Sequence, residues 1–305
     1  MILLFWLILF TLPDGGLYTY DLETGSIERI ATCEDTCLHL AWSSDGRIGF
    51  LDGDYLSIVT LDDGARIDIP IDRGVYTYNV IPDWNEDFTQ VVYAARFDMQ
   101  NRLVIVDITS EEATVYQNIS AVDPRWLPDG RIGFYNNEGI HVFDPNTGDL
   151  IDLTPEGDIH DLPAWSPDGE EIALRARIGQ SDYIWATMDA DGTNGRVITS
   201  AIVERSVWSE DGERLVTLLW RDLKGEQIDL VMFTENELIV LAENAVSGYL
   251  PAWCDDQIIY IGISQTGTMG LYLVDLNTPL EPILLVEPVA DERYIPASPI
   301  VIRQS

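Results

Sequence analysis

Six tryptophans recur along the 305-residue chain at nearly constant intervals, and this repeat restricts the possible folds more than any other feature. The intervals are 42, 42, 39, 43 and 45 residues. An aspartate follows each tryptophan by three residues. The pairs are Trp42 and Asp45, Trp84 and Asp87, Trp126 and Asp129, Trp165 and Asp168, Trp208 and Asp211, and Trp253 and Asp256. A period of about 40–50 residues in strand-rich sequence is typical of one β-propeller blade.

Each repeat has the same order of short segments, rich in β-branched and aromatic residues and separated by Asp-Gly or Asn-Thr-Gly turns. In the fourth repeat an innermost strand ends in the turn Pro163–Gly169, and further strands are expected at 171–174, 183–188 and 196–199. No long segment has helical periodicity. The pattern predicts an all-β fold of four-stranded blades.

The two ends of the chain complete the number of blades. Residues 17–31 match the third and fourth strands of a blade, and Pro296–Ser298 falls in register with Pro251–Trp253. We therefore predict a seven-bladed propeller, whose last blade is closed by N- and C-terminal strands. The alternative is six full blades plus a partial one. The predicted domain spans 1–305, with blades at about 38–80, 81–122, 123–161, 162–204, 205–248 and 249–292, and a split blade made of 293–305 plus 1–32.

We expect the repeated tryptophans and aspartates to be structural. An aspartate can accept hydrogen bonds from the backbone of a tight turn, and a following glycine allows a positive φ. Four repeats keep this glycine, at Gly46, Gly130, Gly169 and Gly212. Each indole is large enough to wedge between neighbouring blades. The alternatives are a ring of metal-binding aspartates and tryptophans exposed for stacking on carbohydrate.

The charge of the chain excludes one class of partner. Lys plus Arg number 17 against 52 Asp plus Glu, for a formal net charge of -35. Nucleic-acid binding depends on neutralising phosphates with Lys and Arg, so no nucleic-acid partner is expected. Anionic membrane surfaces are disfavoured for the same reason, and no stable membrane insertion is expected. A protein or peptide partner is expected first, a glycan remains possible, and we expect a monomer.

The apolar run Met1–Phe10 has two interpretations. It resembles a secretory signal, but no basic residue precedes the apolar stretch and no small-residue cleavage site follows it. It is also too short to span a bilayer. The repeat template needs a strand at this point, and residues 7–12 supply it. We favour the strand, in which case the true gene start and an export signal can lie upstream.

Two of the three cysteines, Cys33 and Cys37, lie four residues apart in the loop before the first innermost strand. A disulfide that closes this loop is expected, and it indicates an oxidising compartment. Two free thiols are the alternative. Cys254 follows Trp253 directly and is expected to be a packed thiol.

Metal-binding patterns in the sequence are weak. His39, His141 and His160 are its only histidines, and they lack the spacing of zinc or lyase-type sites. Residues 189–194 resemble part of a calcium loop but lack its further oxygen ligands and distal Glu. We therefore expect neither a metal nor a cofactor.

The repeats resemble those of the TolB-like family of β-propellers, which read roughly P-x-W-S-P-D-G and end a later strand in M-D-x-D-G-x-N. Pro163–Gly169 and Met188–Asn194 are near-complete matches, and the similarity spans about residues 7–303. The resemblance implies a periplasmic or extracellular bacterial scaffold that binds a protein partner on one face. The extra α/β domain of TolB and its usual six blades are not evident here. Similar repeats occur in propellers fused to prolyl-oligopeptidase-type hydrolases and in some polysaccharide lyases.

Motifs of enzymes that use propellers are missing from the sequence. A serine hydrolase needs a G-x-S-x-G elbow, and Gly262–Gly267 has the wrong spacing. The W-x-x-D-G turns do not match the Asp boxes of sialidases. We therefore expect that the chain is not an enzyme.

A partner is expected on the face formed by two sets of loops, those that lead into the innermost strands and those between the second and third strands. We call it the top face. Loops on a rigid scaffold often carry function, and Tyr and Arg are enriched at binding hot spots. The candidates are Tyr76, Tyr78, Asp123, Arg125, His160, Asp161, Glu204, Arg205, Tyr249, Arg293 and Tyr294.

Three hypotheses follow for the function. The first is a non-enzymatic, extracytoplasmic scaffold that binds a protein or peptide at the top face and axial opening. The second is a glycan-binding or degenerate carbohydrate-active propeller, which predicts exposed aromatic side chains along a cleft. The third is a regulatory propeller associated with a prolyl-oligopeptidase-type peptidase.

Overall fold

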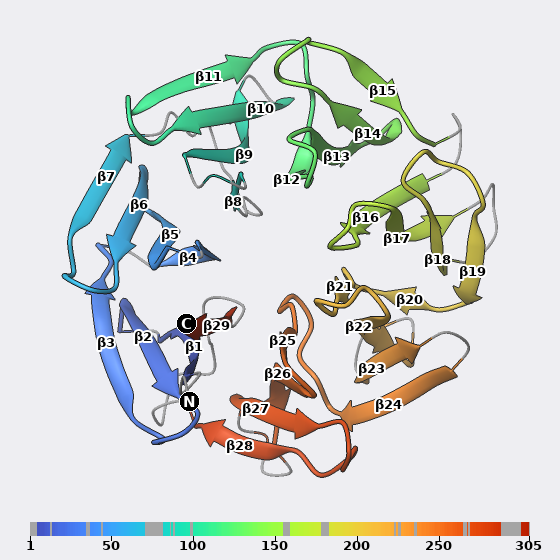
Figure 1. Cartoon of the computed structure of the whole chain (residues 1–305). Helices are drawn as coiled ribbons and strands as arrows, with labels where there is room; N and C mark the ends of the chain where they lie inside the picture. Colours follow the sequence, from blue (N-terminus) through green and yellow to red (C-terminus); the bar gives the residue numbers. More distant parts are fainter. Residues whose placement is uncertain are drawn as a thin grey trace.

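Seven β-sheets surround a central axis in the computed structural model of the chain (Figure 1). The structure describes residues 5–12, 14–34, 37–43, 45–70, 82–85, 87, 89–97, 100–154, 159–177, 183–222, 224, 227–234, 237–264, 267, 269–287 and 300–304. Within these ranges every regular element is a strand, and no helix that could cross a membrane is found. The predicted all-β, seven-bladed propeller is confirmed.

Blades 1 to 4 are four-stranded antiparallel sheets, ordered from the innermost strand outward. Their strands are β4 (Leu38–Trp42), β5 (Arg47–Asp52), β6 (Tyr55–Thr60) and β7 (Arg66–Pro70) in blade 1; β8 (Asp83–Trp84), β9 (Gln90–Phe97), β10 (Gln100–Asp107) and β11 (Glu112–Tyr116) in blade 2; β12 (Val122–Trp126), β13 (Ile132–Asn136), β14 (Gly139–Phe143) and β15 (Leu150–Asp152) in blade 3; and β16 (Ile159–Trp165), β17 (Glu171–Arg177), β18 (Ile184–Asp189) and β19 (Arg196–Thr199) in blade 4.

Blades 5 to 7 follow the same order, except that two short pieces make up the innermost strand of blade 5. Their strands are β20 (Ile202–Val203), β21 (Val207–Trp208), β22 (Arg214–Trp220), β23 (Ile228–Thr234) and β24 (Glu237–Glu243) in blade 5; β25 (Ala252–Cys254), β26 (Gln257–Ile263), β27 (Met269–Asp275) and β28 (Ile283–Val286) in blade 6; and β29 (Ile300–Gln304), β1 (Phe5–Thr11), β2 (Gly16–Asp21) and β3 (Ile27–Thr32) in blade 7.

The ring is closed by strands from the two ends of the chain, which meet in blade 7 (Figure 1). The apolar N-terminal run forms β1, which pairs with β2 on one side and with the C-terminal β29 on the other. In the second pairing, Leu7 lies opposite Ile302. The closure predicted from the repeat template is therefore confirmed. It leaves no unpaired strand edge between the first and last segments of the ring.

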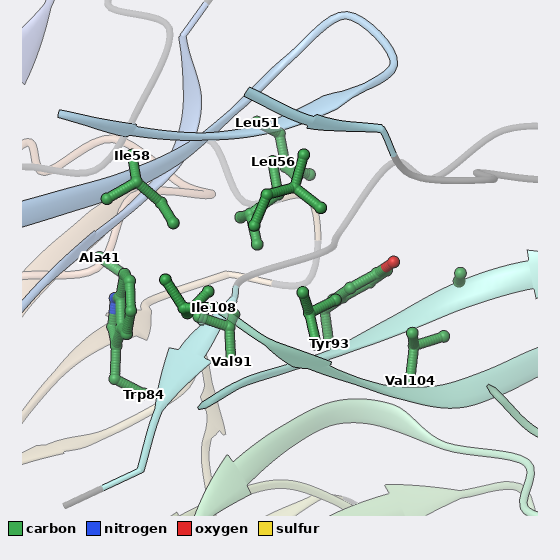
Figure 2. Packing of buried hydrophobic residues seen from close by; sticks show 12 residues of the cluster. Ala41, Leu51, Leu56, Ile58, Trp84, Val91, Tyr93, Val104 and Ile108 are labelled. Atoms are coloured by element: carbon green, nitrogen blue, oxygen red, sulfur yellow. The ribbon is translucent and has the colours of Figure 1, made fainter. Parts of the chain in front are cut away.

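The core consists of seven hydrophobic clusters, and each lies between two adjacent blades. Figure 2 shows the cluster between blades 1 and 2, where the 7% exposed Trp84 lies against Ala41. Two indoles also form hydrogen bonds between blades. Trp208 Nε1 donates to the Ala164 carbonyl at 2.8 Å, and Trp253 Nε1 donates to the Val207 carbonyl at 3.0 Å. The repeated tryptophan therefore packs against the preceding blade in the six blades that carry it.

A glycine in the second strand makes room for the next tryptophan at two of these interfaces. A Cβ at Gly133 would lie 2.4 Å from Trp165 Cζ2, and a Cβ at Gly49 would lie 2.9 Å from Trp84 Cζ2. Neither glycine has a positive φ. Close packing of the neighbouring indole is thus the feature that needs a glycine here.

Serine side chains organise the turn after the tryptophan in three repeats. In blade 4, Ser166 Oγ donates to Asp168 at 2.6 Å and accepts from the backbone N–H of Glu171 at 2.9 Å. Ser43 and Ser209 make the same contacts with Asp45 and Asp211. The expected backbone contacts are also present, since Asp168 accepts from the backbone N–H of Glu170 and Asp211 from that of Glu213. The serine is an additional partner of the aspartate, which the sequence interpretation did not foresee.

Cys33 and Cys37 form a disulfide, with their Cα atoms 5.5 Å apart. Inside this loop, the backbone N–H of Glu34 donates to both carboxylate oxygens of the buried Asp52, at 2.9 and 3.1 Å. Cys254 is a free thiol, 2% exposed. The disulfide therefore fixes the connection between the split blade and blade 1.

We predict that Gly133→Ala destabilises the ring because the added Cβ overlaps the Trp165 indole. Overpacking of this kind costs about 1–3 kcal/mol of unfolding free energy. Gly195→Ala is the matched control, since a Cβ there meets nothing within 4 Å and the residue has no positive φ. Urea denaturation of both variants measures the difference. Equal stability of the two variants would show that the indole is not packed as described.

We also predict one reactive thiol per chain when the unreduced protein is denatured and titrated with a thiol reagent, and three after reduction. The double variant Cys33→Ser, Cys37→Ser should lose about 2 kcal/mol of unfolding free energy, the chain-entropy value for so short a loop. Three thiols without reduction would rule out the disulfide.

Candidate functional site

The innermost strands are irregular at the same point of several repeats. In blades 1, 3 and 4, two residues of the innermost strand lie opposite one residue of the second strand, just before the tryptophan. In blade 5 the irregularity is larger, and residues 204–206 separate β20 from β21. A β-bulge redirects the side chain that it carries. A bulge at this position therefore changes the direction of the side chains just before the tryptophan.

The bulge position three residues before the tryptophan holds Asp123 in blade 3 and Arg205 in blade 5. Asp123 has a φ of 53°, an uncommon value for a residue other than glycine. Its carboxylate forms an ion pair with Arg205, although blade 4 separates the two blades in the ring. The Asp123 and Arg205 side chains are only 5% and 12% exposed. The pair therefore joins the innermost segments of blades 3 and 5, which face the centre of the ring in Figure 1.

A second charged pair occupies the position directly before the tryptophan, where four other repeats have alanine or valine. Arg125 Nη1 lies 3.5 Å from Asp83 Oδ1, and Arg125 Nη2 lies 3.3 Å from Asp123 Oδ1. The backbone N–H of Trp126 donates to Asp83 Oδ2 at 2.7 Å. Asp83, Asp123, Arg125 and Arg205 thus form one group from three blades, which we call the axial charge cluster.

Burial shifts the pKa of two members of this cluster. Burial raises the pKa of Asp83 above its usual 3.8, although Arg125 and the Trp126 N–H oppose the shift. Burial lowers the pKa of Arg205 to about 10, although Asp83 opposes that shift. Both shifts penalise the charged form, but Arg205 stays protonated at neutral pH. Perturbed ionisable groups of this kind gather at functional sites more often than elsewhere.

Asp161, another candidate, is fully engaged in an ion pair. Arg175 Nε and Nη2 donate to its two carboxylate oxygens at 2.9 and 2.7 Å. The Arg175 guanidinium also lies 4.9 Å from the centre of the Tyr183 ring. Burial, followed by the charge of Asp161, raises the pKa of Tyr135 to about 12. This group therefore links blade 4 to blade 3.

Glu204 connects blades 5 and 6 at the top face. Its carboxylate accepts hydrogen bonds from Trp220 Nε1 at 3.2 Å, from the backbone N–H of Gly248 at 2.9 Å and from Ser247 Oγ. Tyr249 is 8% exposed and packs in the core between blades 6 and 7, so it is not the exposed contact that was expected. The sequence interpretation placed it too close to the surface because it treated the whole connecting segment as loop.

The remaining candidates give less information. His160 lies in β16 opposite Ala176, and His39 lies in β4. His141 is buried, with its ring nitrogens 2.7 Å from Asp152 and 2.8 Å from Asn136. Tyr76, Tyr78, Arg293 and Tyr294 lie outside the described residues. Across the part of the chain that is described, no group of three or more His, Cys, Asp or Glu side chains could hold a metal ion.

The sequence interpretation missed Asp83 and Arg175. Asp83 could have been found, because a charge replaces the alanine or valine of most other repeats at that position. Arg175 lies in a second strand, where nothing in the repeat marks it. Its role depends on its pairing with Asp161, which the strand register alone creates.

No known family profile matches the chain. One relative is the uncharacterized peptidase YuxL of Bacillus subtilis (strain 168), 29% identical over 136 residues, with 40% of this chain and 20% of that protein covered. The chain therefore matches about a fifth of the length of this relative.

Two solved structures illustrate the likeness in fold. TolB from Acinetobacter baumannii superposes with a TM-score of 0.58 at 21% identity, covering 75% of this chain and 61% of that one. An oligogalacturonate lyase from Vibrio parahaemolyticus superposes with a TM-score of 0.71 at 17% identity, covering 85% and 83%. The resemblance to TolB-like propellers is therefore confirmed at the level of the fold.

The expectation that the chain is not an enzyme was wrong. It rested on missing motifs, whereas the relatives include a peptidase by sequence and a lyase by fold. Propellers of this kind therefore occur in enzymes.

We predict that Asp83→Asn changes how stability depends on pH. Because its folded pKa is raised, the folded state holds the Asp83 proton more tightly than the unfolded state does. That stabilisation is present below about pH 4 and is lost as the pH rises through the folded pKa. The variant lacks this loss and still offers an acceptor to the Trp126 N–H. Its unfolding free energy relative to wild type should therefore rise between about pH 4 and pH 8, as measured by urea denaturation. A difference that does not vary with pH would contradict the prediction.

Proposed function

We propose that the top face binds an extended peptide segment, centred on the axial charge cluster. The observation that carries this proposal is the gathering of two aspartates and two arginines from three blades inside the ring. Burying charges costs stability, and apolar residues of similar volume often do as well or better. A ring that needed only to stay folded has no use for such a cluster. A polar, partly desolvated centre suits a ligand that itself carries charges and hydrogen-bonding groups.

A peptide suits this surface better than a glycan does. Sugar recognition by stacking needs exposed aromatic faces, and the second hypothesis predicts them along a cleft. Among the aromatic side chains whose exposure is described, only Tyr55 is classed as exposed, at 41%, and it begins the third strand of blade 1. The described part of the top face instead offers charged side chains, which complement backbone amides and charged residues of a peptide.

The relatives and the disulfide supply the context. A peptidase among the relatives supports a role in binding peptides, either in a separate propeller or beside a catalytic domain. The disulfide between Cys33 and Cys37 supports a location outside the cytoplasm, because such bonds persist in oxidising compartments.

The test attaches a polyethylene glycol chain to one face at a time. Asn137→Cys adds a thiol to the loop between β13 and β14 on the top face, and Asn146→Cys adds one to the turn between β14 and β15 on the opposite face. Both asparagines are exposed and belong to the same blade. The native cysteines do not compete, since Cys33 and Cys37 are bonded and Cys254 is buried.

We expect immobilised wild type to capture members of a random peptide pool, identified by mass spectrometry. Modification of Asn137→Cys should weaken capture about tenfold or more, equivalent to about 1.4 kcal/mol, because the polymer covers the top face. Modification of Asn146→Cys should leave capture unchanged. Equal loss from both faces would argue against the assigned face. No capture by wild type, or capture of glycans alone, would refute peptide binding.

A further inference from the structure

Two of the repeated tryptophans have an arginine from the preceding blade over the indole. The Arg47 guanidinium lies 5.4 Å from the centre of the Trp84 ring. The Arg214 guanidinium lies 4.9 Å from the centre of the Trp253 ring, and its Nη1 donates to Asp256 Oδ1 at 2.9 Å in the turn that follows. A cation over an indole is attracted by the negative face of the ring. The tryptophan and the turn aspartate of blade 6 therefore hold one guanidinium together.

The interface between blades 3 and 4 has the same residue types in a different arrangement. Arg131 stands at the position of Arg214, since each closes its turn by accepting the same backbone hydrogen bond. Its Nε donates to Asp129 Oδ2 at 2.6 Å, within its own turn. Among the described residues, no guanidinium lies over the Trp165 ring and no cation pairs with Asp168. The tryptophan and aspartate of blade 4 therefore lack the cation that their equivalents in blade 6 share.

A pocket of about 230 Å³ lies beside these two residues, among the turns on the face opposite to the top face. Its walls include Trp165 and Asp168 from blade 4, and Leu127, Pro128 and Arg131 from blade 3. A cavity of roughly 150 Å³ is enough for a benzene molecule, so a planar guanidinium has room here. Pockets that enclose whole small ligands usually exceed about 300 Å³. The pocket therefore suits the end of one side chain.

We propose that this pocket binds an arginine side chain of a partner protein, with the guanidinium over Trp165 and paired with Asp168. The bound group repeats the arrangement that the chain itself builds with Arg214, Trp253 and Asp256. The inference goes beyond the proposed peptide binding and does not depend on it, because the pocket lies on the other face of the ring.

The charges at the pocket favour a cation. The carboxylates of Asp129 and Asp168 outnumber the single guanidinium of Arg131 along its walls. Hydrogen bonds from Ser166 Oγ and the backbone N–H of Glu170 hold the pKa of Asp168 below its usual 3.8, so this carboxylate is ionised at neutral pH. The formal net charge of -35 attracts basic partners from a longer range. Arginine suits the pocket better than lysine, because a planar guanidinium stacks on an aromatic ring while it pairs with a carboxylate.

The experiment titrates the whole chain, isotope-labelled in its tryptophan side chains, with N-acetyl-arginine amide and follows the indole N–H signals by NMR. N-acetyl-citrulline amide is the matched control ligand, because it has nearly the same shape without the charge. The signals of Trp84 and Trp253 are internal controls, since arginines of the chain already lie over their rings. A phenylalanine variant at each of these positions and at Trp165 assigns the three signals. Thermal unfolding verifies that each variant is folded.

We expect the Trp165 signal to move saturably with the arginine derivative and to stay in place with the citrulline derivative. Asp168→Asn should weaken binding about tenfold, since the carboxamide keeps the hydrogen bonds of the turn but removes the charge. Asp211→Asn is the matched control variant, because Asp211 accepts the same two hydrogen bonds in the turn of blade 5. It should bind like wild type.

Several results overturn the proposal without affecting peptide binding at the top face. One is a Trp165 signal that does not move in wild type. If it then moves in Arg131→Gln, Arg131 itself fills the pocket. Another is equal movement with the citrulline derivative, which shows that the pocket does not recognise the charge. Tighter binding of free arginine than of its capped amide identifies a small molecule as the occupant and overturns the partner protein as the source.

Discussion

The packing of one tryptophan per repeat against the preceding blade is the interaction on which the ring depends. No blade has a core of its own, because all seven hydrophobic clusters lie between blades. Six of the seven interfaces hold a repeat tryptophan and need room for its indole, which Gly133 provides for Trp165. Such an arrangement is stable only when every blade has two neighbours. The pairing of β1 with β29 completes blade 7, which packs against blades 6 and 1, and it uses an apolar N-terminal run that by itself resembled an export signal.

A closed ring brings side chains from different repeats together at its centre, which a linear array of repeats does not do. The same repeat position from every blade points toward one axis, so residues distant in the sequence meet there. Asp123 and Arg205 form a pair for this reason, although a whole blade lies between them in the ring. Each of these charged residues occupies a repeat position at which most other repeats have an apolar residue. The departures from the repeat, rather than the repeat itself, therefore create the candidate site.

Features that depend on the repeat spacing and on turn residues could be predicted from the sequence. Contacts between residues from different blades, which meet only in the folded ring, could not. The blade number, the all-β content and the split blade follow from spacing and turn residues. The contact of Asp123 with Arg205 depends on where β-bulges occur, and a bulge with Asp123 at a φ of 53° leaves no mark in the sequence. Tyr249 was expected at the surface because the whole segment before its blade was treated as a loop, but its side chain is buried in the core. The expectation that the chain is not an enzyme was wrong, because a search for motifs recognises only those types of active site that are already known.

The energetics of the axial charge cluster argue that its residues do more than stabilise the ring. Closure already comes from strand pairing and seven apolar interfaces, and these need no charge at the axis. Burial raises the pKa of Asp83 and lowers the pKa of Arg205, so burial opposes the charged form of both residues. The ion pair of Asp161 with Arg175 shows that this fold can match an arginine completely where it serves structure. Arg205 lacks this two-pronged contact, since it meets Asp123 through Nη2 and its Nε has no hydrogen-bond acceptor among the described residues.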